Sequence, residues 1–191
     1  MQETYKNNGG AGGAGQALPG WESLTLQLSG TVYDSIVDGP GLRYTIFVQG
    51  CPHACPGCQN PETQPMEGGR TIDTTAILQQ MAENPILSGI TFSGGEPFLQ
   101  PAPLASLARA VHQRGLDVWS YSGFTLEELA KRAEKNKATR ALLNELDVLV
   151  DGPYEEEQRD LTLHFRGSRN QRVIDMKKTR KAGRIVLLYT D

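Results

Sequence analysis

The sequence has very little cysteine, and all of it lies in one place. Only three of the 191 residues are cysteines, and they fall within CPHACPGC, at positions 51, 55 and 58. An odd number of closely spaced thiols, with no export signal before them, excludes the disulfide framework of a small secreted protein. The cysteines therefore indicate local chemistry rather than covalent cross-linking.

Other features are also lacking, and each absence excludes a class of protein. No apolar run approaches the roughly 18 residues of a membrane span, and residues 1–20 lack the basic and apolar regions of a secretory signal. The net charge is −3 and no block of basic residues occurs, so neither a nucleic-acid nor a membrane surface is indicated. We therefore expect a cytoplasmic protein.

The residues that are present describe one globular domain preceded by a tail. The length and the apolar fraction of 38% are those of an ordinary single domain. Residues 1–20 are rich in glycine and alanine, which makes them costly to order. We predict a disordered tail over residues 1–20 and a folded domain over residues 21–191.

Strand-like and helix-like patterns alternate along the predicted domain. The strand patterns cover residues 42–48, 89–95, 116–123, 146–152 and 183–191. Helix patterns lie between them, and the clearest begins with Thr125 and Glu128 as a capping box. This alternation predicts an α/β fold built of parallel βαβ units. Because the chain is too short for an eight-unit barrel, we expect an open sheet or a partial parallel β/α barrel.

One loop follows each of the first four predicted strands. These loops are the cysteine loop (residues 51–60), GGEP (94–97), SYSG (120–123) and DGPY (151–154). In folds of this kind the carboxyl ends of the parallel strands form the ligand-binding edge. We therefore predict that the four loops meet at one rim.

The spacing C-x3-C-x2-C predicts a metal site, because thiolates bind soft metals. A structural zinc site needs four ligands, and the histidines available as a fourth are His53, His112 and His164. A [4Fe–4S] cluster held by protein alone takes four cysteines, so three leave one iron open to a ligand that is not protein. Three thiols without any metal are the remaining interpretation.

Three stretches of the sequence resemble a known family. The cysteine spacing after a first strand, with GGE after a second, resembles the radical S-adenosylmethionine (SAM) superfamily. Within it, SIVDGPGLRYTIFVQGCPHACPGCQNPET (35–63) resembles the glycyl-radical-enzyme activases. The stretches VLVDGPY (148–154) and FRGSRNQRVID (165–175), together with CPGC, resemble more narrowly the activating proteins of anaerobic ribonucleoside-triphosphate reductase. The resemblance covers roughly residues 30–175.

The resemblance implies a function and its cofactors. Cys51, Cys55 and Cys58 are then the ligands of a [4Fe–4S] cluster whose fourth iron binds SAM. A flavodoxin or ferredoxin supplies an electron that cleaves SAM, and the resulting 5′-deoxyadenosyl radical removes a hydrogen from one glycine of the partner, anaerobic ribonucleoside-triphosphate reductase. Because the cofactors carry this chemistry, no side chain is expected to act as a general base or nucleophile. The fold implied is the partial β/α barrel of the radical SAM type.

The residue before the third cysteine departs from the superfamily pattern. Most members have an aromatic residue there, near the adenine of SAM, whereas this sequence has Gly57. The CPGC form occurs in the reductase-activating branch. The resemblance therefore implies that the adenine is contacted by backbone atoms of Gly57, Cys58 and Gln59.

Acidic and glycine residues at two other strand ends are further candidates. The resemblance implies that Gly94 and Gly95 present backbone atoms to the ammonium group of SAM, with Glu96 as a nearby charge partner. A bare glycine pair is otherwise a turn. Asp151 also ends a predicted strand, and it fits equally an acid that faces the ligand and a simple turn initiator.

Three arginines near the end of the resemblance have two interpretations. Arg166, Arg169 and Arg172 lie close together in the sequence. Charges in this pattern are most simply a solvated loop, whereas the resemblance implies a surface that faces the partner enzyme.

Two other functions stay open at this stage. One is a different radical SAM enzyme, either another glycyl-radical activase or an enzyme with a small-molecule substrate. The other is a zinc or iron–sulfur binding module without catalysis, in which GGEP is only a turn.

Overall fold

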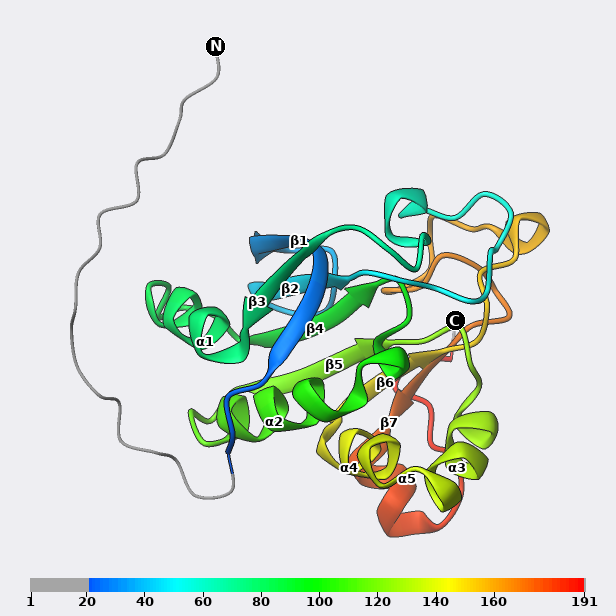
Figure 1. Ribbon diagram of the computed structural model, residues 1–191. Helices are drawn as coiled ribbons and strands as arrows, with labels where there is room; N and C mark the ends of the chain where they lie inside the picture. The colour runs from blue at the N-terminus through cyan, green and yellow to red at the C-terminus, as the bar shows by residue number, and fades with distance from the viewer. Residues whose placement is uncertain (1–20, 191) are drawn as a thin grey trace, which may run out of the picture.

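The computed structural model describes residues 21–190, which form an α/β fold around one seven-stranded sheet (Figure 1). The strands are β1 (Thr25–Ser35), β2 (Arg43–Val48), β3 (Arg70–Asp73), β4 (Gly89–Gly94), β5 (Asp117–Tyr121), β6 (Val148–Asp151) and β7 (Arg172–Asp175). Their order across the sheet is β3-β1-β2-β4-β5-β6-β7. The predicted tail over residues 1–20 lies outside the described residues.

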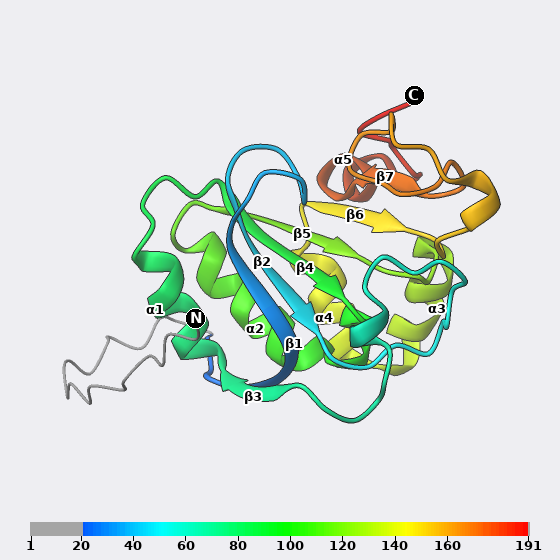
Figure 2. The same ribbon diagram turned by 90° about the horizontal axis from the view of Figure 1, so that it is seen from above.

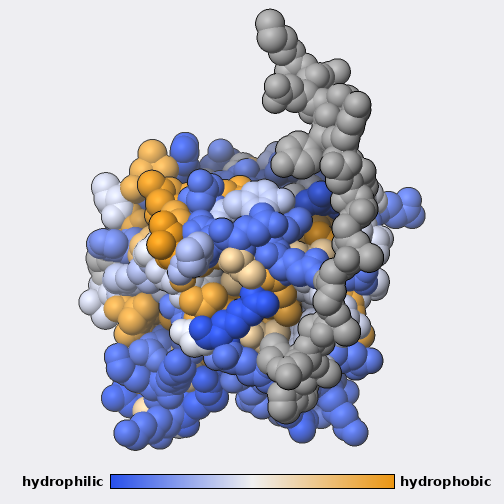
Figure 3. Space-filling view, turned by 90° about the vertical axis from the view of Figure 1, so that its left-hand side faces the viewer, coloured by the Kyte–Doolittle hydropathy of each residue, from blue (hydrophilic) through white to orange (hydrophobic). Residues whose placement is uncertain are grey.

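Residues 21–190 contain five helices and three short 3-10 turns, and the fifth helix follows the last strand. The helices are α1 (Thr74–Ala82), α2 (Pro101–His112), α3 (Leu126–Lys135), α4 (Lys137–Glu145) and α5 (Met176–Ala182). The 3-10 turns are η1 (Pro61–Thr63), η2 (Pro97–Leu99) and η3 (Glu156–Gln158). None of the helices within residues 21–190 is both long and apolar enough to cross a membrane. The side of the molecule that Figure 3 shows is largely hydrophilic, with its apolar side chains in separate groups.

The predicted parallel core of the sheet is confirmed. β2, β4, β5 and β6 are neighbours, and each pairs with the next in parallel. The capping box of α3 is also present, since Oγ1 of Thr125 accepts from the backbone N–H of Glu128 and the Glu128 side chain accepts from the backbone N–H of Thr125. After α3, the side chain of Asn136 caps a separate helix, α4.

The two margins of the sheet differ from the prediction. β1 and β3 extend one margin in antiparallel pairing, and β7 pairs antiparallel with β6 at the other. The last strand, predicted over residues 183–191, is wrong: α5 ends at Gly183 (φ 65°), and the chain beyond it makes one isolated bridge, from Leu187 to Ile174. The apolar run there packs onto the sheet as a cover, because Tyr189 packs against the side chains of β5 to β7.

The sheet has two different faces. Alternate residues of a strand point to opposite sides, and one side packs against a layer formed by α1, α2, α3 and α4, which makes the main hydrophobic core. Figure 2 shows α2 and α4 behind the strands. The opposite face, here called the open face, has a smaller apolar cluster of Trp119, Val148, Val150 and Val173, packed against Tyr121, Phe165 and Tyr189. Beside this cluster the open face has room for a site.

A buried arginine joins the beginnings of three parallel strands on the open face. Arg43 has no exposed surface. Its Nε donates to Oγ1 of Thr91 at 2.6 Å, and its Nη2 donates to the carbonyl of Ile90 at 2.8 Å and to Oδ1 of Asp117 at 2.6 Å. The guanidinium also lies 5.3 Å from the ring centroid of Trp119. Arg43 therefore fixes β2, β4 and β5 relative to one another.

Removing the counter-ion of this arginine should destabilise the fold. In Asp117→Ala the buried guanidinium loses its carboxylate, and because that carboxylate is partly solvated the expected loss is about 2–3 kcal/mol of unfolding free energy. Urea denaturation measures it. The matched control is Lys178→Ala, which breaks the exposed Lys178–Asp175 pair and should cost less than about 1 kcal/mol. Equal losses in the two variants would show that Arg43 needs no counter-ion.

Candidate functional site

The predicted meeting of four loops is confirmed by a cavity of about 870 Å³ on the open face. Its lining includes the three cysteines, the end of β4, the end of β5 and the beginning of the segment after β6. The connection from β1 to β2 and the residues that follow β6 complete the wall. The carboxyl ends of the parallel strands thus form the rim of a single site.

The cysteine loop presents all three thiols to this cavity. Cys51, Cys55 and Cys58 are half-buried and line it together. The backbone turns sharply between them, with positive φ at Ala54 (48°) and Gly57 (67°). The backbone N–H of residue 60 donates to Sγ of Cys58 at 3.4 Å, the kind of contact that stabilises a thiolate ligand. These features fit the metal-site prediction.

The donor set fits an iron–sulfur cluster better than a single zinc ion. Within residues 21–190, no three or more Cys, His, Asp or Glu side chains converge as ligands of one metal ion. The thiolates around a [4Fe–4S] cluster bind different irons, so they need not converge on one point. His53 and His112, predicted as alternative fourth ligands, bond instead to Glu96 (2.9 Å) and to the carbonyl of Glu145 (2.7 Å). His164 stacks on Tyr189, at 5.0 Å between ring centroids.

The glycine pair lies where a side chain has no room. Gly94 has φ 91°, and a Cβ there meets the Cα of Phe47 at 2.6 Å. A Cβ on Gly95 collides with the carbonyl oxygen of Gly50, just before the first cysteine. The N–H of Gly95 donates to the carbonyl of Val48 at 2.9 Å. Both glycines line the cavity, so they bring the end of β4 against the entry to the cysteine loop.

Glu96 has surroundings that differ from the expected ones. It is fully buried and is not among the residues that line the cavity. Its carboxylate accepts hydrogen bonds from His53, Ser122, Gly123 and Phe98. These protein donors satisfy the carboxylate without a ligand, and its expected role as a charge partner for SAM stays a prediction. Sequence reasoning missed this because the donors come from distant parts of the chain.

The residues around the third cysteine divide between cavity and surface. Cys58 and Gln59 line the cavity. Gly57 is exposed and is not among the residues that line the cavity, and a Cβ there would meet the carboxylate of Glu156 at 2.7–3.0 Å.

Residues 153–171, here called the covering segment, form a wall that sequence reasoning did not assign to the site beyond the DGPY loop (151–154). Leu161, His164, Phe165 and Arg166 of this segment line the cavity. Phe165 has positive φ (53°), its carbonyl accepts from the hydroxyl of Tyr121 at 2.9 Å, and its ring packs on Trp119. The only signal in the sequence was the family resemblance over 165–175, because nothing in its composition indicates burial.

The arginine cluster is largely not a free surface. Arg172 forms ion pairs with Asp151 (2.5 Å) and Glu127 (2.7 Å), and these carboxylates raise its pKa further above the usual value. Arg169 pairs with Asp160 at 2.8 Å. The interpretation as a solvated loop is therefore wrong for Arg172, which lies in β7 and holds that strand to the end of β6. A surface that faces the partner enzyme stays a prediction.

Asp151 is a structural residue at the rim. It is fully buried. Besides the ion pair with Arg172, its Oδ2 accepts from the backbone N–H of Leu126 at the first turn of α3. The sequence left two interpretations of Asp151 open, an acid that faces the ligand and a turn initiator. Its surroundings fit a residue that makes no contact with a ligand.

The fit between β4 and the cysteine loop can be tested with one methyl group. Gly95→Ala forces its Cβ into the Gly50 carbonyl, so we expect a loss of about 2 kcal/mol or more in unfolding free energy, measured in urea. The amount of iron that Gly95→Ala retains after anaerobic reconstitution should also be lower than in the original protein. Gly30→Ala is the control, because a Cβ there meets nothing within 4 Å, and it should stay within about 0.5 kcal/mol of the original protein.

Burial raises the pKa of the Cys51 thiol above its usual value. The thiolate is the reactive form, so at neutral pH Cys51 of metal-free protein should alkylate more slowly than the thiol of free cysteine. Its rate should keep rising with pH beyond the range in which the rate of free cysteine levels off. Mass spectrometry after timed iodoacetamide treatment across pH 7–10 measures both features, and a pH profile of Cys51 equal to that of free cysteine would contradict the expectation.

Comparison with known proteins gives the family. A family model described as "4Fe-4S single cluster domain" matches residues 37–174. Proteins named anaerobic ribonucleoside-triphosphate reductase-activating protein are 37% identical in Salmonella typhi, 39% in Pasteurella multocida and 35% in Escherichia coli K12; each match covers 71% of this chain and 89–90% of the relative. The solved structure of QueE from Escherichia coli shares 14% identity over 53% of either chain, and its TM-score of 0.43 is too low to define the fold. The chain belongs to the 4Fe-4S family of anaerobic ribonucleoside-triphosphate reductase-activating proteins.

Proposed function

We propose that this protein activates an anaerobic ribonucleoside-triphosphate reductase by generating a glycyl radical on it. The observation that carries the proposal is the cavity on the open face, where three thiols meet the glycine pair at the end of β4. A [4Fe–4S] cluster and SAM bound there would supply the chemistry of one-electron reductive cleavage of the sulfonium and of hydrogen removal from a glycine of the reductase. The protein's own residues bind, orient and shield these groups.

The lining of the cavity supports binding roles for particular residues. Cys51, Cys55 and Cys58 hold the cluster through their thiolates. Gly94 and Gly95 offer backbone atoms to SAM, because the absence of a Cβ lets a ligand approach the chain closely. This part of the proposal is supported by the family membership and by the lining of the cavity.

The adenine contact falls to the backbone of Cys58 and Gln59, which line the cavity. Gly57, the third residue expected there, is turned toward Glu156. Its part in the proposal is to provide the positive φ that turns the chain between the second and third cysteines.

The covering segment limits access to the site. Leu161 and Leu163 line the cavity from the side opposite the sheet strands, together with Phe165. Apolar side chains exclude water and exchangeable hydrogen donors, which radical chemistry requires. The exposed side chain of Leu161 marks the part of this wall that faces outward.

The arrangement of the helices supports the partial barrel of the radical SAM type as the finer description of the fold. Doubly wound sheets have helices on both faces, whereas β/α barrels have them outside only. Here α1 to α4 form one layer, and the opposite face has the cavity. An incomplete barrel leaves a lateral opening through which a segment of another protein can enter. A flavodoxin or ferredoxin-type reductant and a cytoplasmic location belong to the same proposal.

The test is anaerobic reconstitution followed by two product assays. After iron and sulfide analysis, dithionite and SAM are added, 5′-deoxyadenosine is quantified, and the glycyl radical on the cognate reductase is measured by electron paramagnetic resonance. We expect both products, and we expect both to be lost in Cys55→Ala because one cluster ligand is missing. The control Lys178→Ala should keep both.

Other outcomes identify the alternatives. SAM cleavage without a radical on the reductase indicates a different radical SAM enzyme. A stable cluster that leaves SAM intact indicates an electron carrier, and a colourless protein with one tightly bound zinc indicates a structural site.

A further inference from the structure

Glu96 lies behind the wall of the cavity and accepts hydrogen bonds from His53, Ser122 and Gly123, which line it. Oε2 of the carboxylate accepts from Nε2 of His53 (2.9 Å) and from the backbone N–H of Gly123 (2.9 Å). Oε1 accepts from the backbone N–H of Phe98 (2.9 Å), and Oγ of Ser122 lies within 3.1 Å of both oxygens. A carboxylate only accepts hydrogen bonds, so His53 is a donor here.

The donors to this carboxylate come from three separate segments. His53 belongs to the cysteine loop, Phe98 to η2 after β4, and Ser122 and Gly123 to the end of β5. Glu96 itself has no exposed surface. A buried carboxylate is stable only when such donors are present, so each of the segments is held by the same group.

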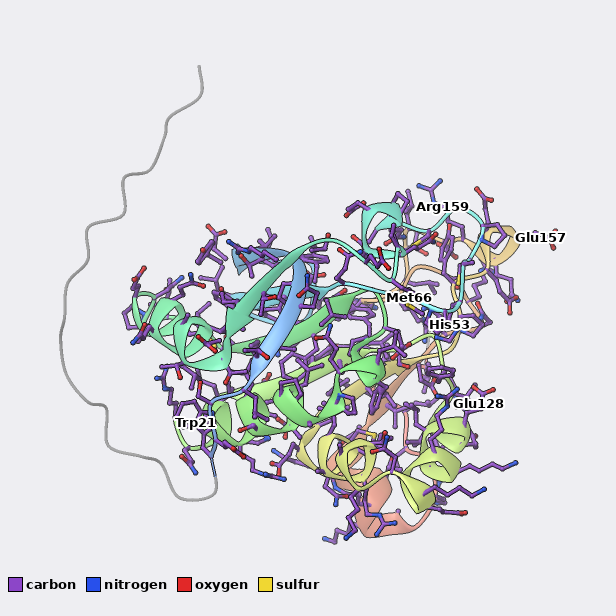
Figure 4. All side chains as sticks on the ribbon, viewed as in Figure 1. Trp21, His53, Met66, Glu128, Glu157 and Arg159 are labelled. Atoms are coloured by element: carbon purple, nitrogen blue, oxygen red, sulfur yellow. The ribbon has the colours of Figure 1, made fainter. Side chains whose placement is uncertain are left out.

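The ring of His53 is fitted to this position from several sides. It lies 4.4 Å from the ring centroid of Phe124, at an interplanar angle of 67°. A Cβ on Gly123 collides with the imidazole, so a glycine there allows His53 to reach Glu96. The guanidinium of Arg132 lies over the ring of Phe124, 3.8 Å from its centroid. In Figure 4 His53 lies beside the chain that leads into α3, whose Glu128 is also labelled.

We propose that His53 is a positioning residue, which fixes the cysteine loop against the ends of β4 and β5 through its hydrogen bond to Glu96. His53 lies between Cys51 and Cys55, so the bond holds the middle of the loop, whereas the N–H of Cys51 bonds to the carbonyl of Gln64 at its beginning. The same carboxylate holds Gly123, which lines the cavity. Glu96 therefore holds two parts of the wall, the cysteine loop and the end of β5, in a fixed position relative to each other. The consequence for cofactor binding rests on the proposed function, but the geometry of the loop does not.

The alternative for Glu96 is the direct contact with SAM expected from the resemblance. The two roles predict different behaviour in protein that contains neither iron nor SAM. A positioning carboxylate holds the loop in that state as well, whereas a carboxylate reserved for a ligand has no effect on the loop until the ligand binds.

Hydrogen exchange on the full-length, metal-free protein tests the proposal, followed by mass spectrometry of peptides that contain residues 48–60 and 119–126. His53→Phe keeps an aromatic ring on Phe124 but removes the donor, and His53→Gln keeps an amide donor but removes the ring. We expect exchange in both peptides to become about tenfold faster or more in His53→Phe, from the loss of a hydrogen bond to a charged group. In His53→Gln it should return to within about threefold of the original rate.

The matched control is His112→Phe, which removes another histidine hydrogen bond, from the end of α2 to the carbonyl of Glu145 at the end of α4. His112→Phe should leave exchange in the two peptides unchanged. Glu96→Gln should accelerate exchange as His53→Phe does, because one carboxylate oxygen is replaced by a donor that faces other donors. Unfolding midpoints in urea confirm that each variant is folded before exchange is compared.

Two results would overturn the proposal. If His53→Phe exchanges at the original rate while His53→Gln exchanges faster, ring packing on Phe124 holds the loop and the hydrogen bond does not. If Glu96→Gln leaves exchange unchanged in metal-free protein but weakens SAM binding to reconstituted protein, the carboxylate is a ligand. Because exchange needs no turnover, the answer is independent of whether the protein cleaves SAM.

The same variants give a spectroscopic readout after reconstitution. In His53→Phe the cysteines are less well placed, so we expect iron to be lost to a chelator about tenfold faster than from the original protein. His53→Gln should restore retention. Loss at the original rate in His53→Phe would contradict a role of His53 in placing the ligands.

Discussion

A carboxylate without contact to water must be satisfied entirely by protein donors, and this requirement organises the site. Glu96 follows a strand whose end is pressed against β2 at two glycines, so its side chain has little freedom in where it lies. Other segments must therefore supply its hydrogen-bond donors. These segments are the cysteine loop and the end of β5, which are far apart in the sequence. The parallel pairing of β2, β4 and β5 brings them close together. The register of the sheet thus decides which loops meet.

The division of the sheet into two faces explains how one small domain has both a stable core and an accessible site. The helix-covered face buries the larger apolar cluster, which provides most of the hydrophobic stabilisation. The open face is held differently, by Arg43 at the beginnings of the strands and by the cluster around Trp119 beside the site. A cavity lined by loops is therefore compatible with a rigid framework beneath it.

Much of this architecture could be predicted from the sequence, for physical reasons that differ between elements. β2, β4, β5 and β6 are buried on both faces, so they appear as short apolar runs that end in glycine-containing turns. β3 (RTID) and β7 (RVID) have four residues each and begin and end with charged residues, which is too little pattern for a prediction. The apolar end of the chain resembles a strand because a segment that covers a sheet is also apolar.

The site was predictable to the extent that its chemistry is local. Three thiols within eight residues, and a glycine pair after a strand, are visible without a structure. The partners of Glu96 and Arg172 are not visible, because they lie 21 to 45 residues away and depend on strand register. Charge patterns alone gave Arg172 the wrong role, since a sequence shows that a side chain is charged but not which group neutralises it.

An open sheet also has two margins at which unpaired backbone groups invite other strands to add. In this protein both margins are poor templates. β3 is four residues long and begins and ends with the charged residues Arg70 and Asp73, and the outer side of β7 is engaged by the chain around Leu187, through hydrogen bonds that involve Val173 and Asp175. A protein built this way can leave one face of its sheet accessible to another macromolecule without its edges recruiting further copies of itself.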